Sequence, residues 1–385
     1  MNKKLLVIVS DRISDILRKG EYCERYYNPG NLFEEVHILL TNDDQPNTEN
    51  LQKTVGKAKL FIHNLPHPSF IQSLGWQFPL LNKWVNSGIE LVQKISPALI
   101  RCYGLNLNTY LAECIRMNVK IPLIVSLHND PDSDFSSVSQ NIKEVVAQSR
   151  AKRVSEKFLD KVDRFIIVYS AIEPYLNKKK FSNYSLIYNV VGIGITPKTD
   201  YRVHKEKIKC LCLGKQNINQ KDQLPIIEAI SRIDKVELHL YGYGDLHDSL
   251  VKRVKELNIE DRVIFKEGVS NEILMRDIHS FDIYIYNSLQ HEISKSIIEA
   301  ALCGLPIIHN KPTFKCSEEL SEDYIYMVEN NPNSYQEALE KLINNQLLRE
   351  KYGKRAFLHA QKEWLPSVNE QKIVNLYKSF LKTNS

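Results

Sequence analysis

The stretch from residue 281 to residue 310 combines residue types that could hold an anion. A predicted strand, Ile283–Tyr286, is followed by a polar turn, and Ser294 is a favourable N-cap for a helix over Lys295–Cys303. Gly304 would end that helix, because glycine readily adopts the left-handed conformation found there. The turn would lie where a strand ends and a helix begins, so free backbone N–H groups could attract a phosphate.

Glu299 would lie a little over one turn into this helix, near the same end. A carboxylate there can accept hydrogen bonds from both hydroxyls of a ribose. The alternative is a glutamate that only interacts favourably with the helix dipole. We expect the start of the helix, at Ser294, Lys295 and Ser296, to bind the phosphate.

Two lysines follow another predicted strand, Ile208–Leu213. Lys215 and Lys221 are six residues apart, and their ammonium groups could stabilise negative charge on a departing anion. The alternative is a solvated loop, which is the usual place for such lysines. His128 follows a predicted strand over residues 122–127, where it could bind ligand hydroxyls or be a structural histidine.

The rest of the sequence predicts the elements that must position these residues. Short apolar runs alternate with helical patterns, which favours parallel sheets covered on both faces. The predicted strands fall into two groups, covering residues 5–9, 35–40, 59–62, 99–102, 122–127, 164–168 and 185–188, and then 208–213, 236–241, 263–265, 283–286 and 306–308.

The two groups of strands predict an α/β fold with two doubly wound, Rossmann-like domains that face a central cleft. The first domain covers residues 1–192, a linker with Gly, Pro and polar residues covers 193–207, and the second domain covers 208–364. Residues 365–385 carry an apolar stripe at helical spacing. This last helix either finishes the second domain or returns to cover the first.

The composition bounds the class of protein. The chain has 385 residues, 43% hydrophobic and 25% charged, which excludes disorder, collagen and coiled coil as global classes. The net charge of +5 is too small to predict a nucleic-acid partner, but it is compatible with a phosphorylated ligand. Seven scattered cysteines without a C-x-x-C motif predict reduced thiols in a cytosolic protein and no zinc site.

The apolar run at residues 5–9 is shorter than the roughly 7–15 apolar residues of a signal peptide. No stretch approaches the roughly 18 apolar residues of a membrane span. We therefore expect a cytoplasmic protein. Basic runs at 150–153 and 178–180 could bind an anionic inner membrane face, although such runs are usually solvated surface. The aromatic-rich stretch 70–84 could help to bind a lipid-linked acceptor, with core packing as the favoured interpretation.

Other enzyme classes lack their motifs. The chain has no G-x-G-x-x-G after the first strand, no G-x-x-x-x-G-K-[ST] and no G-x-S-x-G. Asp130, Asp132 and Asp134 have a spacing that could hold a divalent cation. No glycine follows Asp134 as in an EF-hand, so a solvated acidic loop is the favoured interpretation.

Several of these segments resemble retaining glycosyltransferases of family four (glycosyl transferases group 1), which have the GT-B fold. Residues 299–306, with the sequence EAALCGLP, are similar to the second half of the family's Glu-x7-Glu region. Residues 208–215 resemble its strand ending in Gly-Arg, and residues 241–245 resemble its Gly-x-Gly turn. Residues 261–269 resemble the strand and loop whose main chain contacts the nucleobase.

The first domain resembles the family less closely. Residues 121–128 are similar to a strand that ends in a histidine near the acceptor. Residues 162–170 and 187–189 are similar to the closing strands of that domain. Gly20 corresponds to the glycine loop that follows the family's first strand.

Two departures from the family concern the donor site. Six residues separate Glu292 from Glu299, where the family has seven, so that His291 stands at the first glutamate position. Either the turn is one residue shorter, or His291 contacts the donor sugar in place of Glu292. Lys215 replaces the usual arginine, which keeps the charge but loses the bidentate fork.

The resemblance implies an enzyme that transfers a hexosyl or N-acetylhexosaminyl group, with retention, from a nucleotide-sugar to a glycan or lipid-linked acceptor. It also implies a role in surface or secreted glycan synthesis, with no metal and no cofactor apart from the nucleotide-sugar substrate. The alternative, motivated by His291, is a glycosyltransferase-like binding subunit that has lost turnover.

The resemblance assigns roles to individual residues. Lys215 and Lys221 would hold the diphosphate, Glu299 the ribose, and the main chain of Val269 the base. His291 or Glu292 would contact the donor sugar, and His128 would face the acceptor. The remaining expected donor contacts are Gly20, Gly214, Gly242, Ser294, Lys295 and Ser296.

Overall fold

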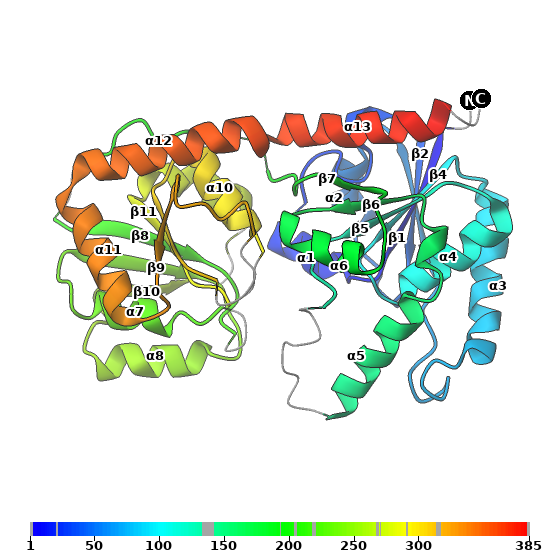
Figure 1. Cartoon of the computed structure of the whole chain (residues 1–385), viewed down its shortest axis with the longest axis horizontal. Coiled ribbons are helices and arrows are strands. Elements are labelled where there is room, and N and C mark those ends of the chain that lie inside the picture. The colour runs from blue at the N-terminus through cyan, green and yellow to red at the C-terminus, as the bar shows by residue number, and fades with distance from the viewer. Residues whose placement is uncertain are drawn as a thin grey trace. The chain divides into compact units, whose positions relative to one another are not determined.

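The computed structural model describes residues 3–20, 22–132, 142–192, 194–203, 206–217, 221–266, 269, 271–289, 292–312 and 317–382. The chain divides into two compact units (Figure 1). The first unit comprises Met1–Arg18, Tyr22–Val190 and Asn369–Ser385, and the second comprises Lys19–Glu21 and Val191–Val368.

In the described part of the first unit, seven parallel strands form one sheet in the order β3-β2-β1-β4-β5-β6-β7. Their bounds are β1 Lys4–Val9, β2 Glu35–Leu40, β3 Lys59–Asn64, β4 Leu99–Tyr103, β5 Leu123–Leu127, β6 Arg164–Ile167 and β7 Tyr184–Leu186. Most of these strands are buried along their length, as expected for a parallel sheet covered on both faces.

Helices flank both faces of this sheet. They are α1 Ile13–Lys19, α2 Thr48–Gln52, α3 Phe78–Ile95, α4 Leu107–Val119, α5 Ile142–Ser155, α6 Glu173–Lys178 and α13 Pro366–Lys382. One core cluster contains Leu5 and Val7 of β1 together with Ile13 of α1 and Leu51 of α2. Because side chains alternate along a strand, the intervening residues of β1 face the other side of the sheet, where α4 contacts β1, β4 and β5.

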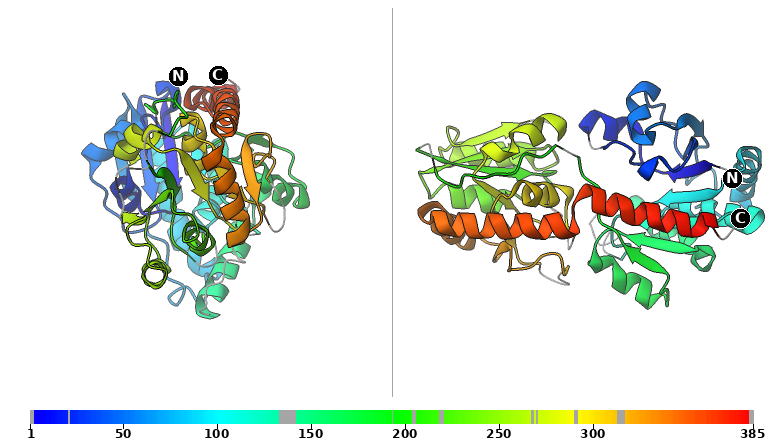
Figure 2. Two further views of the ribbon diagram at one scale, coloured as in Figure 1. Left: turned by 90° about the vertical axis from the view of Figure 1, so that its left-hand side faces the viewer. Right: turned by 90° about the horizontal axis from the view of Figure 1, so that it is seen from above.

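Helix α13 packs on the core of the first unit (Figure 2). Tyr377 is 1% exposed within that core, and the rest of the predicted apolar stripe packs against it. Glu370, near the start of the helix, accepts hydrogen bonds from the Arg25 guanidinium at 2.8 and 3.2 Å and from the Gly30 N–H at 2.9 Å. The sequence left open whether this helix finishes the second domain or covers the first, and in the structure it covers the first unit.

In the described part of the second unit, six parallel strands form a sheet in the order β10-β9-β8-β11-β12-β13. Their bounds are β8 Ile208–Leu213, β9 Val236–Tyr241, β10 Val263–Lys266, β11 Ile283–Tyr286, β12 Ile307–Asn310 and β13 Ile325–Val328. The helices are α7 Leu224–Ile230, α8 His247–Glu256, α9 Asn271–Asp277, α10 Lys295–Cys303, α11 Pro332–Asn344 and α12 Gln346–Glu363. The predicted architecture of two doubly wound α/β units is confirmed.

Alternation along β8 separates the two faces of this sheet. Cys210 and Cys212 lie in the core cluster that α7, α8 and α11 cover, on one face as predicted. Leu211 is fully buried but lies outside that cluster, as expected for the opposite face. Strand β13 was not predicted from the sequence.

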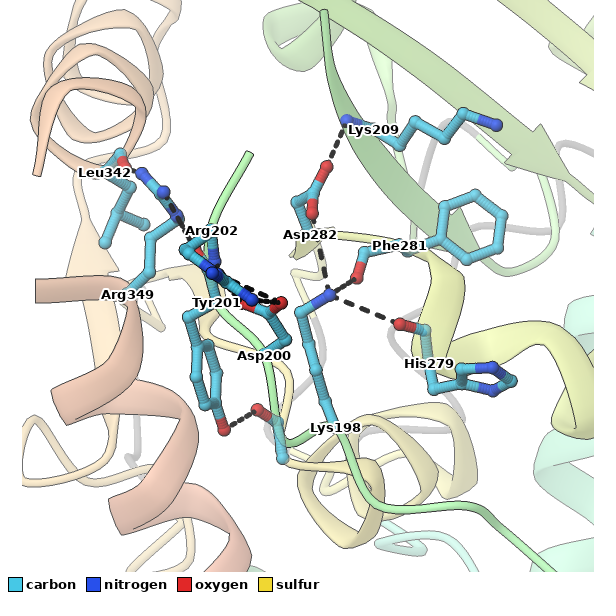
Figure 3. Close-up of polar contacts among 11 residues, drawn as sticks. Lys198, Asp200, Tyr201, Arg202, Lys209, His279, Phe281, Asp282, Leu342 and Arg349 are labelled. Atoms are coloured by element: carbon cyan, nitrogen blue, oxygen red, sulfur yellow. Dashed lines mark hydrogen bonds and ion pairs between the residues drawn. The ribbon is translucent and has the colours of Figure 1, made fainter. Parts of the chain in front are cut away.

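Residues 198–202, in the segment predicted as a linker, are held within the second unit (Figure 3). The Lys198 ammonium donates to the carbonyls of His279 and Phe281 and lies 3.5 Å from the carboxylate of Asp282. The Tyr201 carbonyl accepts two hydrogen bonds from the guanidinium of Arg349 at 2.8 and 3.2 Å. Among the described residues, no helix is both long and apolar enough to cross a bilayer.

Candidate functional site

The start of α10 has the geometry that its sequence predicts. Ser294 is the N-cap, and its Oγ accepts a hydrogen bond from the backbone N–H of Ile297 at 3.3 Å. Gly304 ends the helix with a φ of 81°, in the left-handed region. Because β8, β9, β10 and β11 are parallel, their carboxyl ends lie along one edge of the sheet, and α10 begins beyond the end of β11.

Two hydroxyl groups are fixed at this helix start. The Oγ atoms of Ser294 and Ser296 lie 2.9 Å apart. The hydroxyl of Tyr284, a fully buried residue of β11, donates to the Oγ of Ser296 at 2.7 Å. Lys295 lies between the two serines and is half-buried. The first turn therefore presents backbone amides and held hydroxyls, a combination suited to an anion.

Glu299 is 4% exposed on the second turn of α10. Its Oε1 accepts a hydrogen bond from the Nδ2 of Asn271, the first residue of α9, at 2.9 Å. This contact joins α9 to α10 through two residues that are 28 positions apart in the chain. Asn271 was not among the predicted residues. By holding one carboxylate oxygen, it orients Glu299 as a hydrogen-bond acceptor.

Lys221 and Glu292 form an ion pair, with Nζ 3.2 Å from Oε1. The ammonium also lies 5.7 Å from the ring centroid of Tyr286, a buried residue at the end of β11. Burial opposes the charge on Lys221, but Tyr286 and Glu292 outweigh it and raise the pKa of this lysine above its ordinary value. Lys221 is therefore a permanently charged group at this edge of the sheet.

Lys215 lies in the same loop as Lys221, but in a different environment. Its side chain is exposed, whereas that of Lys221 is only 18% exposed. The carbonyl of Lys215 accepts a hydrogen bond from the Nε2 of Gln223 at 3.2 Å. The structure thus places both predicted lysines in the loop after β8, and it brings Lys221 rather than Lys215 into contact with Glu292.

Two glycines let the loops after β8 and β9 pack closely. Gly242 has a φ of 136°, and a Cβ built on it would lie 2.0 Å from the carbonyl oxygen of Gly214. The N–H of Gly214 donates to the carbonyl of Tyr241 at 3.1 Å. The Nε2 of Gln216 donates to the carbonyl of Gly242 at 3.1 Å. Any side chain at residue 242 would force these loops apart.

The turn after β11 is also held by polar contacts. The Nδ2 of Asn287 donates to the carbonyl of Asp222, next to Lys221, at 2.6 Å. Ser288 and Asn310 exchange two hydrogen bonds of 2.8 Å between backbone and amide atoms. These contacts fix the backbone on either side of the Lys221–Glu292 pair, although neither asparagine was singled out in the sequence.

The other predicted residues of this group lie in separate places. Val269 is half-buried in the segment between β10 and α9. Gly20 follows α1 with a φ of 68°, which makes it the residue that ends this helix. His291 lies outside the described residues.

His128 lies in the first unit, directly after β5. Its ring centroid is 5.6 Å from that of Tyr103, at the end of β4, and both residues line the same pocket. The predicted residues thus fall into two sets, one in each unit. Those in the second unit are Gly20, Gly214, Lys215, Lys221, Gly242, Val269, Glu292, Ser294, Lys295, Ser296 and Glu299.

The aspartate spacing that suggested a cation site includes Asp132, which forms ion pairs with two lysines. The carboxylate of Asp132 lies 2.7 Å from the ammonium of Lys152 and 3.2 Å from that of Lys178. Asp134 lies outside the described residues. No group of three or more His, Cys, Asp or Glu side chains suited to a metal ion occurs in the part of the chain that the structure describes.

The sequence of this chain is similar to those of known glycosyltransferases. Residues 199–359 match the family model of glycosyl transferases group 1. The chain is 25% identical over 264 residues to an uncharacterized glycosyltransferase of Methanocaldococcus jannaschii, covering 64% of this chain and 66% of that protein. It is 22% identical over 267 residues to a poly(ribitol-phosphate) alpha-N-acetylglucosaminyltransferase of Staphylococcus aureus, covering 67% of this chain and 53% of that protein.

The fold is shared over nearly the whole chain. The structure of HepE from Anabaena in complex with UDP and glucose superposes with a TM-score of 0.71, at 16% identity, over 98% of this chain and 100% of that one. This likeness confirms the GT-B fold that the sequence resemblance predicted. The family match confirms the resemblance itself over the second unit.

Proposed function

We propose that this chain, with a GT-B fold and a match to glycosyl transferases group 1 over residues 199–359, is a retaining nucleotide-sugar-dependent glycosyltransferase. The observation that carries the proposal is the Lys221–Glu292 pair beside the start of α10. A charged lysine, oriented serines and a held glutamate meet there at the carboxyl ends of parallel strands. This arrangement suits a ribose diphosphate.

The leaving group is the nucleoside diphosphate, which gains negative charge as its bond to the sugar breaks. Lys221 and the first backbone amides of α10 would stabilise that charge, with the exposed Lys215 contributing from the same loop. Glu299 would accept hydrogen bonds from the ribose hydroxyls, and the main chain at Val269 would contact the base. These groups would suffice without a metal ion.

Glu292 is the described candidate for the donor-sugar contact, with His291 as the alternative. Its carboxylate lies against Lys221, so binding of a diphosphate would compete with it for the ammonium. A carboxylate released in this way can accept hydrogen bonds from sugar hydroxyls. We therefore propose that Glu292 exchanges its lysine for the donor sugar when the donor binds.

The donor would be a UDP-hexose or a UDP-N-acetylhexosamine. HepE was solved with UDP and glucose, and the Staphylococcus aureus relative is named as an N-acetylglucosaminyltransferase. His128, in the first unit, would face a glycan or lipid-linked acceptor. The product would belong to a surface or secreted glycan.

We also propose that the enzyme is cytoplasmic and binds the inner face of an anionic membrane through the loop before α3. Ile71 and Leu74 in this loop are 84% and 73% exposed. The Nε of Arg150, on α5, holds the loop through the carbonyl of Gly75 at 2.9 Å. Part of the basic surface is engaged within the unit, because Lys179 lies 2.7 Å from the carboxylate of Glu156.

A second candidate is a binding subunit that retains the nucleotide site without turnover. It is favoured by the Lys221–Glu292 contact, which occupies both of the groups expected to act on the donor. The two candidates differ in whether the diphosphate is released when an acceptor is present.

A panel of UDP-sugars and GDP-sugars tests the proposal by thermal shift, because a ligand that binds only the folded state raises the melting temperature. A cognate donor should stabilise the wild type and release its nucleoside diphosphate when an acceptor is added. NMR of the product should show the anomeric configuration of the donor. Binding without release would support the binding subunit, and no shift with any member of the panel would contradict both candidates.

A further inference from the structure

The first unit contains a pocket of its own, formed only by residues of that unit. Its lining comes from the segment after α1, from strands β4 and β6, from residues 187–190 after β7 and from the first turns of α13. The polar residues that line it include Arg25, Tyr26, Arg101, Tyr103, His128 and Glu370, together with Glu24, Tyr188 and Asn189. The sequence indicated only His128 among them.

Arg101 is the unusual member of this lining. It lies in the middle of β4 and is only 3% exposed. Its Nη1 donates to the hydroxyl of Tyr377 at 3.1 Å, but its Nε has no hydrogen-bond partner among the described residues. No carboxylate of the described chain lies within ion-pair distance of it. A buried guanidinium without an anion is costly, so a further partner is expected.

Aromatic rings surround this guanidinium. Its carbon lies 5.0 Å from the ring centroid of Tyr103 and 5.8 Å from that of Tyr377. The ring of Tyr26 stacks on Tyr103 at a centroid distance of 5.8 Å. Neither the Tyr26 hydroxyl nor the Tyr103 hydroxyl forms a hydrogen bond to any residue that the structure describes. Burial raises the pKa of both phenols, so each remains a hydrogen-bond donor.

The other charged side chains of the pocket pair with one another. Arg25 lies 2.8 Å from Glu370 and 2.9 Å from Glu24, so its guanidinium already has two carboxylates. These carboxylates are 23% and 54% exposed, whereas Arg101 is almost fully buried. Arg101 is therefore the cation of the pocket that has no carboxylate within ion-pair distance among the described residues, and two phenolic donors lie beside it.

We propose that this pocket binds an anionic oxygen group, a phosphate or a carboxylate, through Arg101 and the hydroxyls of Tyr26 and Tyr103. A guanidinium binds such groups with paired, charge-assisted hydrogen bonds. The anionic group belongs to the acceptor, because His128 lines the same pocket and is the residue expected on the acceptor side. This assignment to the acceptor rests on the proposed function, whereas the binding of the anion does not.

Calorimetric titration of inorganic phosphate into protein saturated with UDP tests the proposal, since UDP fills the diphosphate contacts of the second unit. Phosphate should bind the wild type at one site, and Arg101→Gln should weaken this binding at least about tenfold. The matched control is Arg116→Gln, which removes a partly buried guanidinium of the same unit that pairs with Asp163 outside the pocket. It should bind phosphate like the wild type.

A parallel titration with acetate separates the two chemistries, because only a carboxylate site would prefer it to phosphate. If Arg101→Gln does not fold, the double variant Tyr26→Phe, Tyr103→Phe replaces it, and its phosphate affinity should fall several-fold. The proposal is overturned if neither anion binds the wild type, or if both sets of variants bind as the wild type does.

The acceptor assignment has its own readout. With an acceptor that carries the preferred anion, Arg101→Gln should raise the acceptor KM and leave the UDP-induced thermal shift unchanged. If UDP produces no shift in the wild type, the proposed function fails. In that case the phosphate titration still tests whether the pocket binds an anion. Lys221→Met is then the control that detects phosphate bound to the second unit instead.

Discussion

The ammonium of Lys221 and the carboxylate of Glu292 lie 3.2 Å apart, and this pair joins the loop after β8 to the turn before α10. This salt bridge holds the ammonium in place and helps to keep it charged, because the Glu292 carboxylate raises the pKa of Lys221. If the proposed diphosphate binds Lys221, it must displace the Glu292 carboxylate, so the proposal links donor binding to release of Glu292.

Lys221→Met should lower kcat/KM for the donor about 100-fold or more, since it removes one preorganised charge from the leaving group. Lys221→Arg should retain much of the activity. The comparison variant is Lys215→Met, which removes an exposed charge from the same loop and should cost less than Lys221→Met. Steady-state kinetics measures all three, and equal losses at both lysines would contradict the difference in their environments.

Glu299→Gln should weaken UDP binding about tenfold or more, because an amide accepts hydrogen bonds from a ribose less well than a carboxylate does. Asn271→Ala should have a smaller effect of the same sign, since it only frees one oxygen of Glu299. Glu256→Gln on α8 is the control and should bind UDP normally. Isothermal titration measures these affinities, and wild-type affinity in Glu299→Gln would remove this residue from the site.

Glu113 predicts an unusual pH dependence of stability. It is fully buried on α4, and burial raises the pKa of its carboxyl to about 9. Between pH 4.5 and about 9 the Glu113 carboxyl is therefore protonated in the folded state, whereas it is ionised in the unfolded chain. Its contribution to stability is complete below pH 4.5 and is lost as the pH rises from 4.5 to about 9.

Glu113→Gln should abolish this dependence and stabilise the first unit by about 3 kcal/mol at pH 7. Denaturant unfolding at pH 5 and pH 8 measures the effect, which should be larger at pH 8. Glu90→Gln, an exposed substitution on α3, serves as the control and should change little at either pH. A Glu113→Gln variant with no greater stability at pH 8 than the wild type would contradict a neutral buried carboxyl.

The exposed apolar loop before α3 predicts membrane binding. The double variant Ile71→Asp, Leu74→Asp should lose most of its sedimentation with vesicles that contain anionic lipid, because it puts charge where apolar side chains would enter the bilayer. Leu347→Asp makes an equally exposed substitution on α12 and should sediment like the wild type. Wild-type protein that stays in the supernatant at low salt would end the membrane proposal.

The sequence predicted the elements with strong local signals. Helix α10 begins and ends where Ser294 and Gly304 predict, because an N-cap hydroxyl and a left-handed glycine act on their immediate neighbours. Strand β13 was missed because it has only four residues, two buried and two partly buried, which are too few to show a periodic pattern. It becomes a strand by pairing with β12, which is a tertiary contact.

The candidate site was predictable as a set of residue types but not as a set of contacts. Nothing local pairs Asn271 with Glu299 or places Glu292 on Lys221, since the chain must first form the sheet that brings them together. Arg101 did leave a signal in the sequence. A charged residue in the middle of an apolar strand at a sheet centre is rare and marks a side chain with a special partner.

Helix α13 has a consequence for how the chain is made. The first unit takes Tyr377 into its core, yet this residue is translated only after the whole second unit. As the nascent chain leaves the ribosome, the N-terminal sheet must wait with part of its apolar face uncovered. The second unit, which lacks this dependence, can complete its own core first, so the order of maturation is the reverse of the order of synthesis.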